Sequence, residues 1–327
     1  MEHHDVARRD AEPAGIRLGI SACLLGQEVR FDGGHKKDAF LTDVLAPHVE
    51  WVPVCPEVEV GMGTPRETLR LVRENGRLRM VTTRSAKDYT DAMNDWSRAR
   101  VAALDAEDLD GYVLKKDSPS CGMERVKVYA SEGPGVRDGR GLFAAALIDR
   151  APLLPVEEEG RLCDPRIREN FIERVFAYRR LKTLFASRWS QGALVRFHTA
   201  HKMSLLAHST TAYQELGRLV AEGKQLARTE LRRRYEELFM ATLSIPATTR
   251  RHTNVLSHMA GHLKNRVDAA SRQELAECIE SYRTGLVPLV VPLTLIKHHV
   301  RVHDVEYLAG QVYLQPHPRE LMLRNHV

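Results

Sequence analysis

The chain has 327 residues, of which 43% are hydrophobic, and a formal net charge of +5. This length exceeds that of a typical domain, so we expect two domains, and the hydrophobic content excludes wholesale disorder. The longest apolar segment, residues 286–296, is too short to span a bilayer and contains two prolines. The N-terminal residues lack the pattern of a signal peptide, and the sequence therefore predicts a cytoplasmic protein.

Charge is divided unevenly along the chain. Residues 1–154 carry 22 Lys and Arg against 25 Asp and Glu, whereas residues 155–327 carry 26 against 18. Eleven of the 15 histidines also lie in the second part. This asymmetry favours chemistry in the first part and a polyanionic partner for the second, although basic helix faces are often only solvated surface.

The first part of the chain alternates short apolar runs with helical patterns, after a loose tail over residues 1–15. A helix is predicted over residues 86–104. Buried strands are predicted over residues 16–22, 51–54, 111–115 and 141–148. Such strands alternating with helices are typical of an α/β layered fold with a largely parallel sheet. We place this domain at residues 16–158.

The sequence predicts helices almost throughout the second domain, residues 159–327. Asp164 and Pro165 have the residue types of an N-cap and a first helical position, and Gly285 that of a C-cap. The predicted helical segments are residues 165–185, 198–209, 211–223, 226–243, 251–265 and 271–285. The sequence therefore predicts an all-α domain here.

Three of the five cysteines stand at equivalent places. Cys23, Cys55 and Cys121 each follow a predicted strand, and ligands of open α/β sheets bind outside the carboxyl ends of the strands. Three thiolates from separate loops would then converge on a soft metal or an iron–sulfur cluster. The alternative is that each is a small buried hydrophobe. We interpret Cys278 as a core residue and Cys163 as incidental.

Polar residues accompany these cysteines. Glu57 lies two residues after the second, where a carboxylate is suited to proton transfer or caps the next helix. Ser118 and Ser120 place two hydroxyls beside the third, although both are also common turn residues. Arg66 is expected either to bind an anion or, more commonly, to pair with a core carboxylate.

Several motifs resemble those of known families. SACLLG with VRFDG, VCPEVEVGMGTPRE and LKKDSPSCG resemble the TudS-type thiouracil desulfidases, over roughly residues 16–155. RFHTAHKMSLLAHS, NVLSHMAGHLK and YLAGQVYLQPHPREL resemble the YbgA-like domain that is often fused to them. Together they resemble the RudS-like desulfidases, which remove sulfur from 4-thiouridine in tRNA.

This resemblance implies a cofactor and a reaction. Cys23, Cys55 and Cys121 would hold a 4Fe–4S cluster in which one iron lacks a protein ligand. The thiocarbonyl sulfur of the substrate would bind that open iron, and water would then replace sulfur on the ring carbon.

The resemblance also implies roles for the polar residues. Glu57 and Ser118 would move protons and orient the substrate, with Ser120 as the alternative serine. Lys115, or its neighbour Lys116, would stabilise negative charge on the pyrimidine, unless it is simply solvated.

Histidines and basic residues of the second domain predict contacts with tRNA. The candidates are His201, Lys202, His208, His258, Lys264, Lys297, His298 and Arg301. Helix packing and solubility are the alternative explanation for each of them. The spacing of His258 and His262 matches a zinc half-site, but no HExxH motif or suitably spaced carboxylate accompanies it.

The leading hypothesis is a cytoplasmic, 4Fe–4S-dependent desulfidase that hydrolyses the C–S bond of 4-thiouridine in tRNA. Three alternatives stay open. The substrate would be a free thiobase such as thiouracil, or the cysteines would carry sulfur as persulfides without a cluster. The third alternative is a non-catalytic RNA-binding protein with a structural metal.

Overall fold

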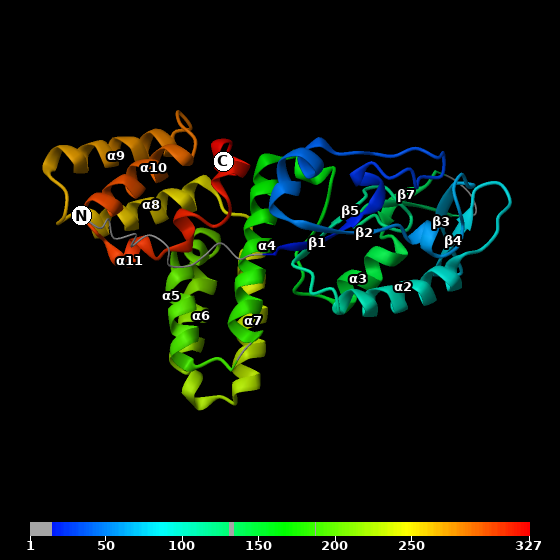
Figure 1. The fold of residues 1–327 in the computed structure, drawn as a ribbon, viewed down its shortest axis with the longest axis horizontal. Helices are drawn as coiled ribbons and strands as arrows, with labels where there is room; N and C mark the ends of the chain where they lie inside the picture. The colour runs from blue at the N-terminus through cyan, green and yellow to red at the C-terminus, as the bar shows by residue number, and fades with distance from the viewer. Residues whose placement is uncertain (1–14, 131–133, 187) are drawn as a thin grey trace, which may run out of the picture. The chain divides into compact units, whose positions relative to one another are not determined.

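The structure, a computed structural model, describes residues 15–130, 134–186 and 188–327. It separates into two compact units, Gly15–Cys163 and Asp164–Val327 (Figure 1). Residues 1–14 of the predicted tail lie outside the described residues. The division falls slightly after the predicted boundary of 158, because Arg161 forms ion pairs with Glu124 and Glu157 of the first unit.

Two sheets form the first unit. One is wholly parallel, with the strand order β2-β1-β5-β8, and it confirms the predicted α/β class. Its strands are β1 (Arg17–Ser21), β2 (Glu50–Val54), β5 (Gly111–Leu114) and β8 (Val156–Glu158). β1 and β5 are almost entirely buried, as the apolar runs predict.

A close backbone approach joins the two central strands of this sheet. A Cβ atom at Gly19 would lie 2.1 Å from the Tyr112 ring, so only glycine fits at this position in β1. The Tyr112 ring is fully buried and contacts Phe143 at a centroid distance of 5.8 Å. This contact ties the middle of the sheet to the helix that carries Phe143.

The second sheet is mixed and has the strand order β4-β3-β6-β7. β3 pairs antiparallel with β4 and parallel with β6, and β6 pairs antiparallel with β7. Its strands are β3 (Leu69–Glu74), β4 (Arg77–Thr82), β6 (Val126–Tyr129) and β7 (Val136–Gly139). The sequence does not predict this sheet, because its strands are rich in charged residues and lack long apolar runs.

Two helices, α2 (Thr90–Asp105) and α3 (Leu142–Arg150), pack against each other on one side of the parallel sheet (Figure 1). α2 matches the helix predicted over residues 86–104. The strand predicted over residues 141–148 is wrong, since this run forms α3. A short apolar run does not distinguish a strand from a buried helix, and three consecutive alanines favour the helix.

The second unit is helical, as predicted. Its principal helices are α4 (Pro165–Ala186), α5 (Gln191–His208), α6 (Thr210–Ala221), α7 (Arg228–Ser244), α8 (Thr249–Leu263), α9 (Ala269–Arg283), α10 (Val290–Val302) and α11 (Glu306–Ala309). Buried residues of α5, α8, α9 and α10 form one large apolar core. Among the described helices, none combines the length and the apolar content that crossing a membrane requires.

A cluster of charged side chains is buried inside the helical unit. Arg324 Nε lies 3.0 Å from Glu169 Oε1, and His208 Nε2 lies 3.4 Å from Glu173 Oε2. Burial raises the pKa of Glu169, but the nearby Arg324 guanidinium outweighs it and holds this pKa below its usual range. Burial likewise lowers the pKa of His208, but its bond with Glu173 raises it overall. The cluster is a network of mutually compensating buried charges.

Candidate active site

Three neighbouring strands each bring one cysteine to the same edge of the parallel sheet. Cys23 lies in the 3-10 turn after β1, Cys55 lies between β2 and α1 (Pro56–Glu59), and Cys121 lies in the loop after β5. Because β2, β1 and β5 are adjacent and parallel, their carboxyl ends meet. All three cysteines line one cavity of about 320 Å³.

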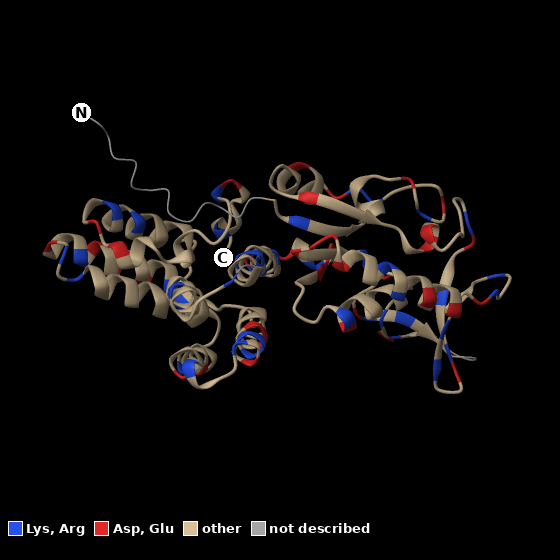
Figure 2. Cartoon of the chain, turned by 60° about the horizontal axis from the view of Figure 1, so that its bottom comes forward, with Lys and Arg blue, Asp and Glu red and all other residues tan. Residues whose placement is uncertain are grey.

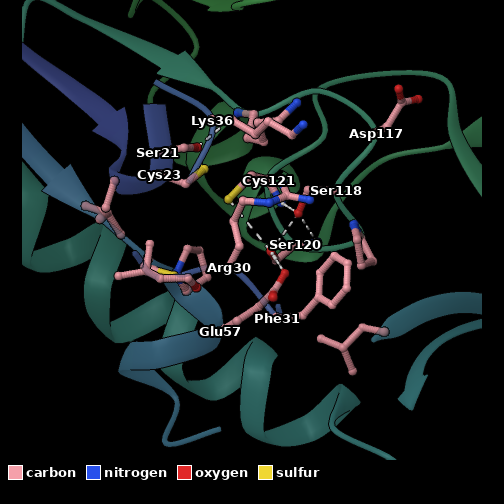
Figure 3. A pocket seen from close by; sticks show the side chains of 18 of the residues that line it. Ser21, Cys23, Arg30, Phe31, Lys36, Glu57, Asp117, Ser118, Ser120 and Cys121 are labelled. Atoms are coloured by element: carbon pink, nitrogen blue, oxygen red, sulfur yellow. Dashed lines mark hydrogen bonds between the residues drawn. The ribbon is translucent and has the colours of Figure 1, made fainter. Parts of the chain in front are cut away.

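Figure 3 shows the interior of this cavity, with the sulfur atoms of Cys23 and Cys121 close together and Glu57 and Ser120 below them. The cavity lies wholly within the first unit. Besides these residues its lining includes Ser21, Arg30, Phe31, Lys36, Arg66, Lys115, Lys116 and Ser118. Sulfur, carboxylate, hydroxyl and basic groups therefore face a common space.

The three thiols are free and sheltered from water. Cys23 and Cys121 are buried and Cys55 is half-buried, and none of them forms a disulfide. Burial raises the pKa of all three, that of Cys23 to about 11. Each thiol must therefore lose a proton to become a metal ligand, so that binding of a metal centre would release protons.

The donor set fits an iron–sulfur cluster, which proteins hold through cysteine thiolates. Within the described residues, no group of three or more His, Cys, Asp or Glu side chains is arranged to hold a single metal ion. A cluster makes a different demand, because each thiolate binds a separate iron. Three thiols that line one cavity from separate loops meet this demand.

Glu57 is held on both of its oxygens. Arg66 donates from Nε and Nη2 to Glu57 Oε2, at 2.9 and 2.5 Å, and Ser120 Oγ donates to Oε1 at 2.8 Å. Arg66 Nη1 also donates to the carbonyl oxygens of Val29 and Gly63, both at 2.9 Å. The Arg66 guanidinium thus connects the loops that follow Cys23 and Cys55. Of the two roles expected for Arg66, it has the commoner one, pairing with a carboxylate.

The two serines occupy different positions. Ser118 Oγ accepts hydrogen bonds from the backbone N–H groups of Ser120, at 3.3 Å, and Cys121, at 3.1 Å. Ser120 Oγ lies between Glu57 and Cys121, 3.7 Å from the Cys121 sulfur. Ser118 therefore shapes the turn, whereas Ser120 is the hydroxyl in contact with both the carboxylate and the thiol.

Two features of the site are not apparent from the sequence. Glu159, directly after β8, forms an ion pair with Lys115 and accepts a hydrogen bond from the backbone of Lys116. Ser21 Oγ accepts from the Lys115 backbone at 3.0 Å, which joins β1 to the loop after β5. The sequence places Glu159 at the start of the second domain, and only the pairing of β8 with β5 brings it to Lys115 and Lys116, which line the cavity.

The residues predicted to contact RNA fall into three groups by exposure. His258, Lys264, His298 and Arg301 are exposed, and Lys202 and Lys297 are half-buried. His201 and His208 are buried, at 2% and 1% exposure. His201 stacks on Phe197 and His208 bonds to Glu173, so helix packing explains both, and we leave them out of any proposed RNA surface.

Comparison with known proteins gives the family. Residues 18–159 match the model of a family described as 2-thiouracil desulfurase, and residues 202–318 match one described as protein of unknown function (DUF1722). The chain is 37% identical over 161 residues to the uncharacterized protein YbgA of Escherichia coli K12, covering 49% of this chain and 95% of YbgA. The chain belongs to the YbgA family and combines a YbgA-like domain with a 2-thiouracil desulfurase domain.

Two further proteins are similar to the chain. The uncharacterized protein YbbK of Bacillus subtilis 168 is 29% identical over 134 residues, covering 39% of this chain and 87% of YbbK. A solved structure of the [4Fe-4S]-dependent thiouracil desulfidase TudS shares 31% sequence identity and has a TM-score of 0.38. That match covers 45% of this chain and 93% of the TudS chain.

Proposed function

We propose that the protein is an iron–sulfur-dependent desulfidase that converts 4-thiouridine in tRNA to uridine. The observation that supports this most directly is the convergence of three free thiols on one cavity beside Glu57 and Ser120. The match of residues 18–159 to the 2-thiouracil desulfurase family supports the same chemistry. The reaction replaces C=S by C=O and consumes water to release hydrogen sulfide, so it balances without an oxidant.

In this proposal Cys23, Cys55 and Cys121 hold a 4Fe–4S cluster. When bound, the cluster would supply Lewis-acid chemistry at an iron without a protein ligand, which suits the sulfur of the substrate. Glu57 accepts the proton of the attacking water, since a fixed carboxylate is an effective general base. Ser120 orients Glu57 Oε1 and Arg66 holds Oε2, so the free lone pairs of the carboxylate keep a fixed direction.

The position of Lys115 determines its part in this proposal. Its ammonium group forms an ion pair with Glu159, and both side chains are largely buried. This pair holds the loop that leads to Cys121 against the end of β8. We therefore propose that Lys115 acts on the substrate only through this loop and does not neutralise pyrimidine charge directly.

The helical unit would supply affinity for tRNA. The part of the chain from residue 155 to 327 carries 26 Lys and Arg against 18 Asp and Glu. Phosphate contacts give binding that weakens steeply with salt, and about six contacts cost roughly a thousandfold in affinity between low and moderate salt. A free thiopyrimidine has no phosphate, and the cavity is complete within the first unit, which favours such compounds as a second substrate class.

The test is a comparison of two substrates with protein purified under anaerobic conditions. The full chain should be brown, contain iron and sulfide, and convert both 4-thiouracil and the 4-thiouridine of tRNA. Rising salt should reduce turnover of tRNA steeply and that of the free base hardly at all. A colourless protein with persulfide sulfur would support the alternative in which the cysteines carry sulfur without a cluster. A protein that converts the free base but not tRNA would contradict tRNA as a substrate.

Point variants in the helical unit complete this test. Lys264→Gln and Arg301→Gln each remove an exposed charge, and Lys202→Gln and Lys297→Gln remove half-buried ones. The exposed pair should weaken tRNA turnover without changing turnover of 4-thiouracil. Equal losses on both substrates would show that the helical unit supports the fold and does not present RNA.

A further inference from the structure

Helix α8 has an unusual exposed face. Its buried stripe, spaced three to four residues apart, consists of His252, Val255, Leu256, Met259 and Leu263. The opposite face is open to solvent and forms only a shallow recess, lined by Asn254, Ser257, His258, Gly261 and His262 of this one helix. No carboxylate or large aliphatic side chain lines it. The exposed face of α8 thus carries small polar side chains and two imidazoles, with open space beside them, whereas its other face is packed in the core.

The helix α8 carries no acidic side chain, a feature that it shares with the helices α5 and α10 that pack against it. No Asp or Glu occurs between residues 238 and 267, whereas this stretch holds four cations, Arg250, Arg251, Lys264 and Arg266. Arg250, Lys264 and Arg266 are exposed. On α7, by contrast, Arg233 forms ion pairs with both Glu230 and Glu237. Figure 2 shows such mixed basic and acidic positions on several helices.

Gly261 is one of the residues that line the recess. It lies inside α8, where glycine is less favourable than alanine because it loses more backbone freedom on folding. A Cβ atom at this position would meet nothing within 4 Å, so packing inside the chain does not require the glycine. Its missing side chain instead keeps the recess open. A group that closely approaches the helix from outside would explain why glycine stands here.

An aromatic ring contacts one of the residues that line the recess. The Tyr307 ring in α11 lies 4.8 Å from the His262 ring, and Figure 1 shows α11 close to α8. Tyr307 is 36% exposed. Unpaired RNA bases bind by stacking on aromatic and histidine rings while amide and hydroxyl groups bond to their edges. Asn254 and Ser257 supply such groups.

We propose that the exposed face of α8 binds an unpaired nucleotide of the tRNA, with its base in the recess at Gly261 and neighbouring phosphates on Arg250 and Lys264. This inference rests on the proposed tRNA substrate and locates one contact with it. RNA is favoured over a protein partner because the face combines uncompensated cations with ring and amide groups and lacks an apolar anchor.

The test separates stability from affinity through two matched glycines. Gly261→Ala should raise the melting temperature by about 2–4 °C, because alanine is the better helix former and meets no clash. Gly217→Ala in α6 is the control, since its Cβ would lie 4.0 Å from the nearest atom, His198 Nε2. Both variants should be more stable than the parent, but only Gly261→Ala should bind tRNA more weakly.

Larger changes sharpen the result. Gly261→Gln fills the recess and should weaken tRNA binding about tenfold, the effect of losing one stacked base. Arg250→Gln combined with Lys264→Gln should lower the salt dependence, with the slope of log affinity against log salt falling by about one for each phosphate that the protein no longer neutralises. Binding is measured with the full chain by fluorescence anisotropy, using a labelled tRNA transcript.

Three outcomes separate the possibilities. Weak and salt-insensitive binding by the parent protein would overturn the proposed tRNA substrate itself. Strong binding by the parent that Gly261→Gln leaves unchanged would overturn the α8 site and spare the proposed function. A change of oligomeric state in Gly261→Gln, with unaltered tRNA affinity, would identify the face as a protein interface and also overturn the α8 site.

Discussion

The two units each contain a carboxylate held by an arginine, and the pairs differ in what surrounds them. Glu57 and Arg66 border the cavity, and the Glu57 side chain is 16% exposed. Glu169 and Arg324 are enclosed by helices, and their side chains are 4% and 7% exposed. Glu57 also has a hydroxyl partner near a thiol, whereas Glu169 lies near His317. The same kind of ion pair therefore borders an open cavity in one unit and is enclosed in the core of the other, and under the proposed function only the first orients a reactive group.

The largest expected effect concerns the cysteines of the cavity. Replacing Cys23, Cys55 or Cys121 by Ser should abolish both the brown chromophore and turnover, because a hydroxyl is a poor ligand for iron. Absorption spectra and iron content measure the first, and release of sulfide measures the second. Cys163→Ser and Cys278→Ser are the matched controls and should change neither the chromophore nor turnover. Bleaching by Cys163→Ser would mean that a fourth cysteine completes the site.

Glu57→Gln should retain the cluster and lower turnover by on the order of a hundred- to ten-thousand-fold. The amide keeps the shape of the side chain but does not exchange a proton at neutral pH. Iron content and the pre-steady-state rate of sulfide release measure the two effects separately. Loss of iron in this variant would assign Glu57 to the organisation of the site.

Arg324→Met should affect stability and leave chemistry alone. Removing one partner of a buried ion pair strands the other charge, and we expect a loss of about 3–5 kcal/mol in the free energy of unfolding. Trp189 reports on the helical unit when Trp51 and Trp96 are replaced by Phe. Its fluorescence during denaturation with urea measures the loss.

A matched control for this variant lies on the surface of α7. Arg233→Met breaks two ion pairs that face solvent, and it should change the stability of the helical unit little. A similar loss in both variants would contradict the distinction between enclosed and exposed pairs.

The pH dependence of the helical unit should follow its buried histidines. Burial lowers the pKa of His198, His201 and His252 to about 4, 3 and 4, respectively. As pH falls below 6.5 the unfolded chain takes up protons at these sites while the folded chain does not, so stability is lost. The raised pKa of His208 acts oppositely, since its contribution is complete below pH 6.5 and is lost as pH rises through the folded value.

Burial also lowers the pKa of His299, so four lowered groups stand against one raised group, and the free energy of unfolding should increase between pH 4.5 and 6.5 by on the order of a few kcal/mol. The fluorescence of Trp189 during denaturation at each pH measures it. His208→Gln should remove the decline at higher pH and also lower stability at every pH, because it takes the imidazole partner away from the buried Glu173. A flat profile between pH 4.5 and 6.5 would show that these histidines are protonated alike in both states.

The smallest expected effects distinguish the two serines. Ser120→Ala removes the hydroxyl that bonds both Glu57 and Ser118 Oγ, and it should lower turnover about tenfold at a smaller cost in stability than Ser118→Ala. Ser118→Ala leaves two backbone N–H groups without their acceptor, and it should cost about 1–3 kcal/mol in stability and some cluster retention. The opposite pattern would make Ser118 the reactive hydroxyl.

Local patterns in the sequence predicted the strands that carry the site but not which of these strands are neighbours in the sheet. The apolar runs before Cys23, Cys55 and Cys121 located three strands of the parallel sheet. The strand order, which makes those strands neighbours, arises from long-range pairing that a single sequence does not reveal. For the same reason the contact of Glu159 with Lys115, at the edge of the cavity, was not predicted.

The helical unit shows a different limit of sequence interpretation. Histidines at helical spacing predicted a polar surface, yet His201 and His208 face the core. Residue type alone does not distinguish a buried, hydrogen-bonded imidazole from an exposed one, because both are stable when their partners are present. Glu173, the partner of His208, is 35 residues away in sequence.

The parallel sheet has a consequence for how such enzymes can diverge. Neighbouring strands lie about 4.8 Å apart because backbone hydrogen bonds fix that spacing, so the separation of the three cysteine loops depends little on nearby side chains. Part of the cavity wall, at Thr68 and Leu69, instead comes from the start of β3 in the other sheet. Under the proposed function, changes in that wall would alter which substrates enter while the edge that carries the three cysteines keeps its dimensions. New substrates could thus be acquired without rebuilding the reactive centre.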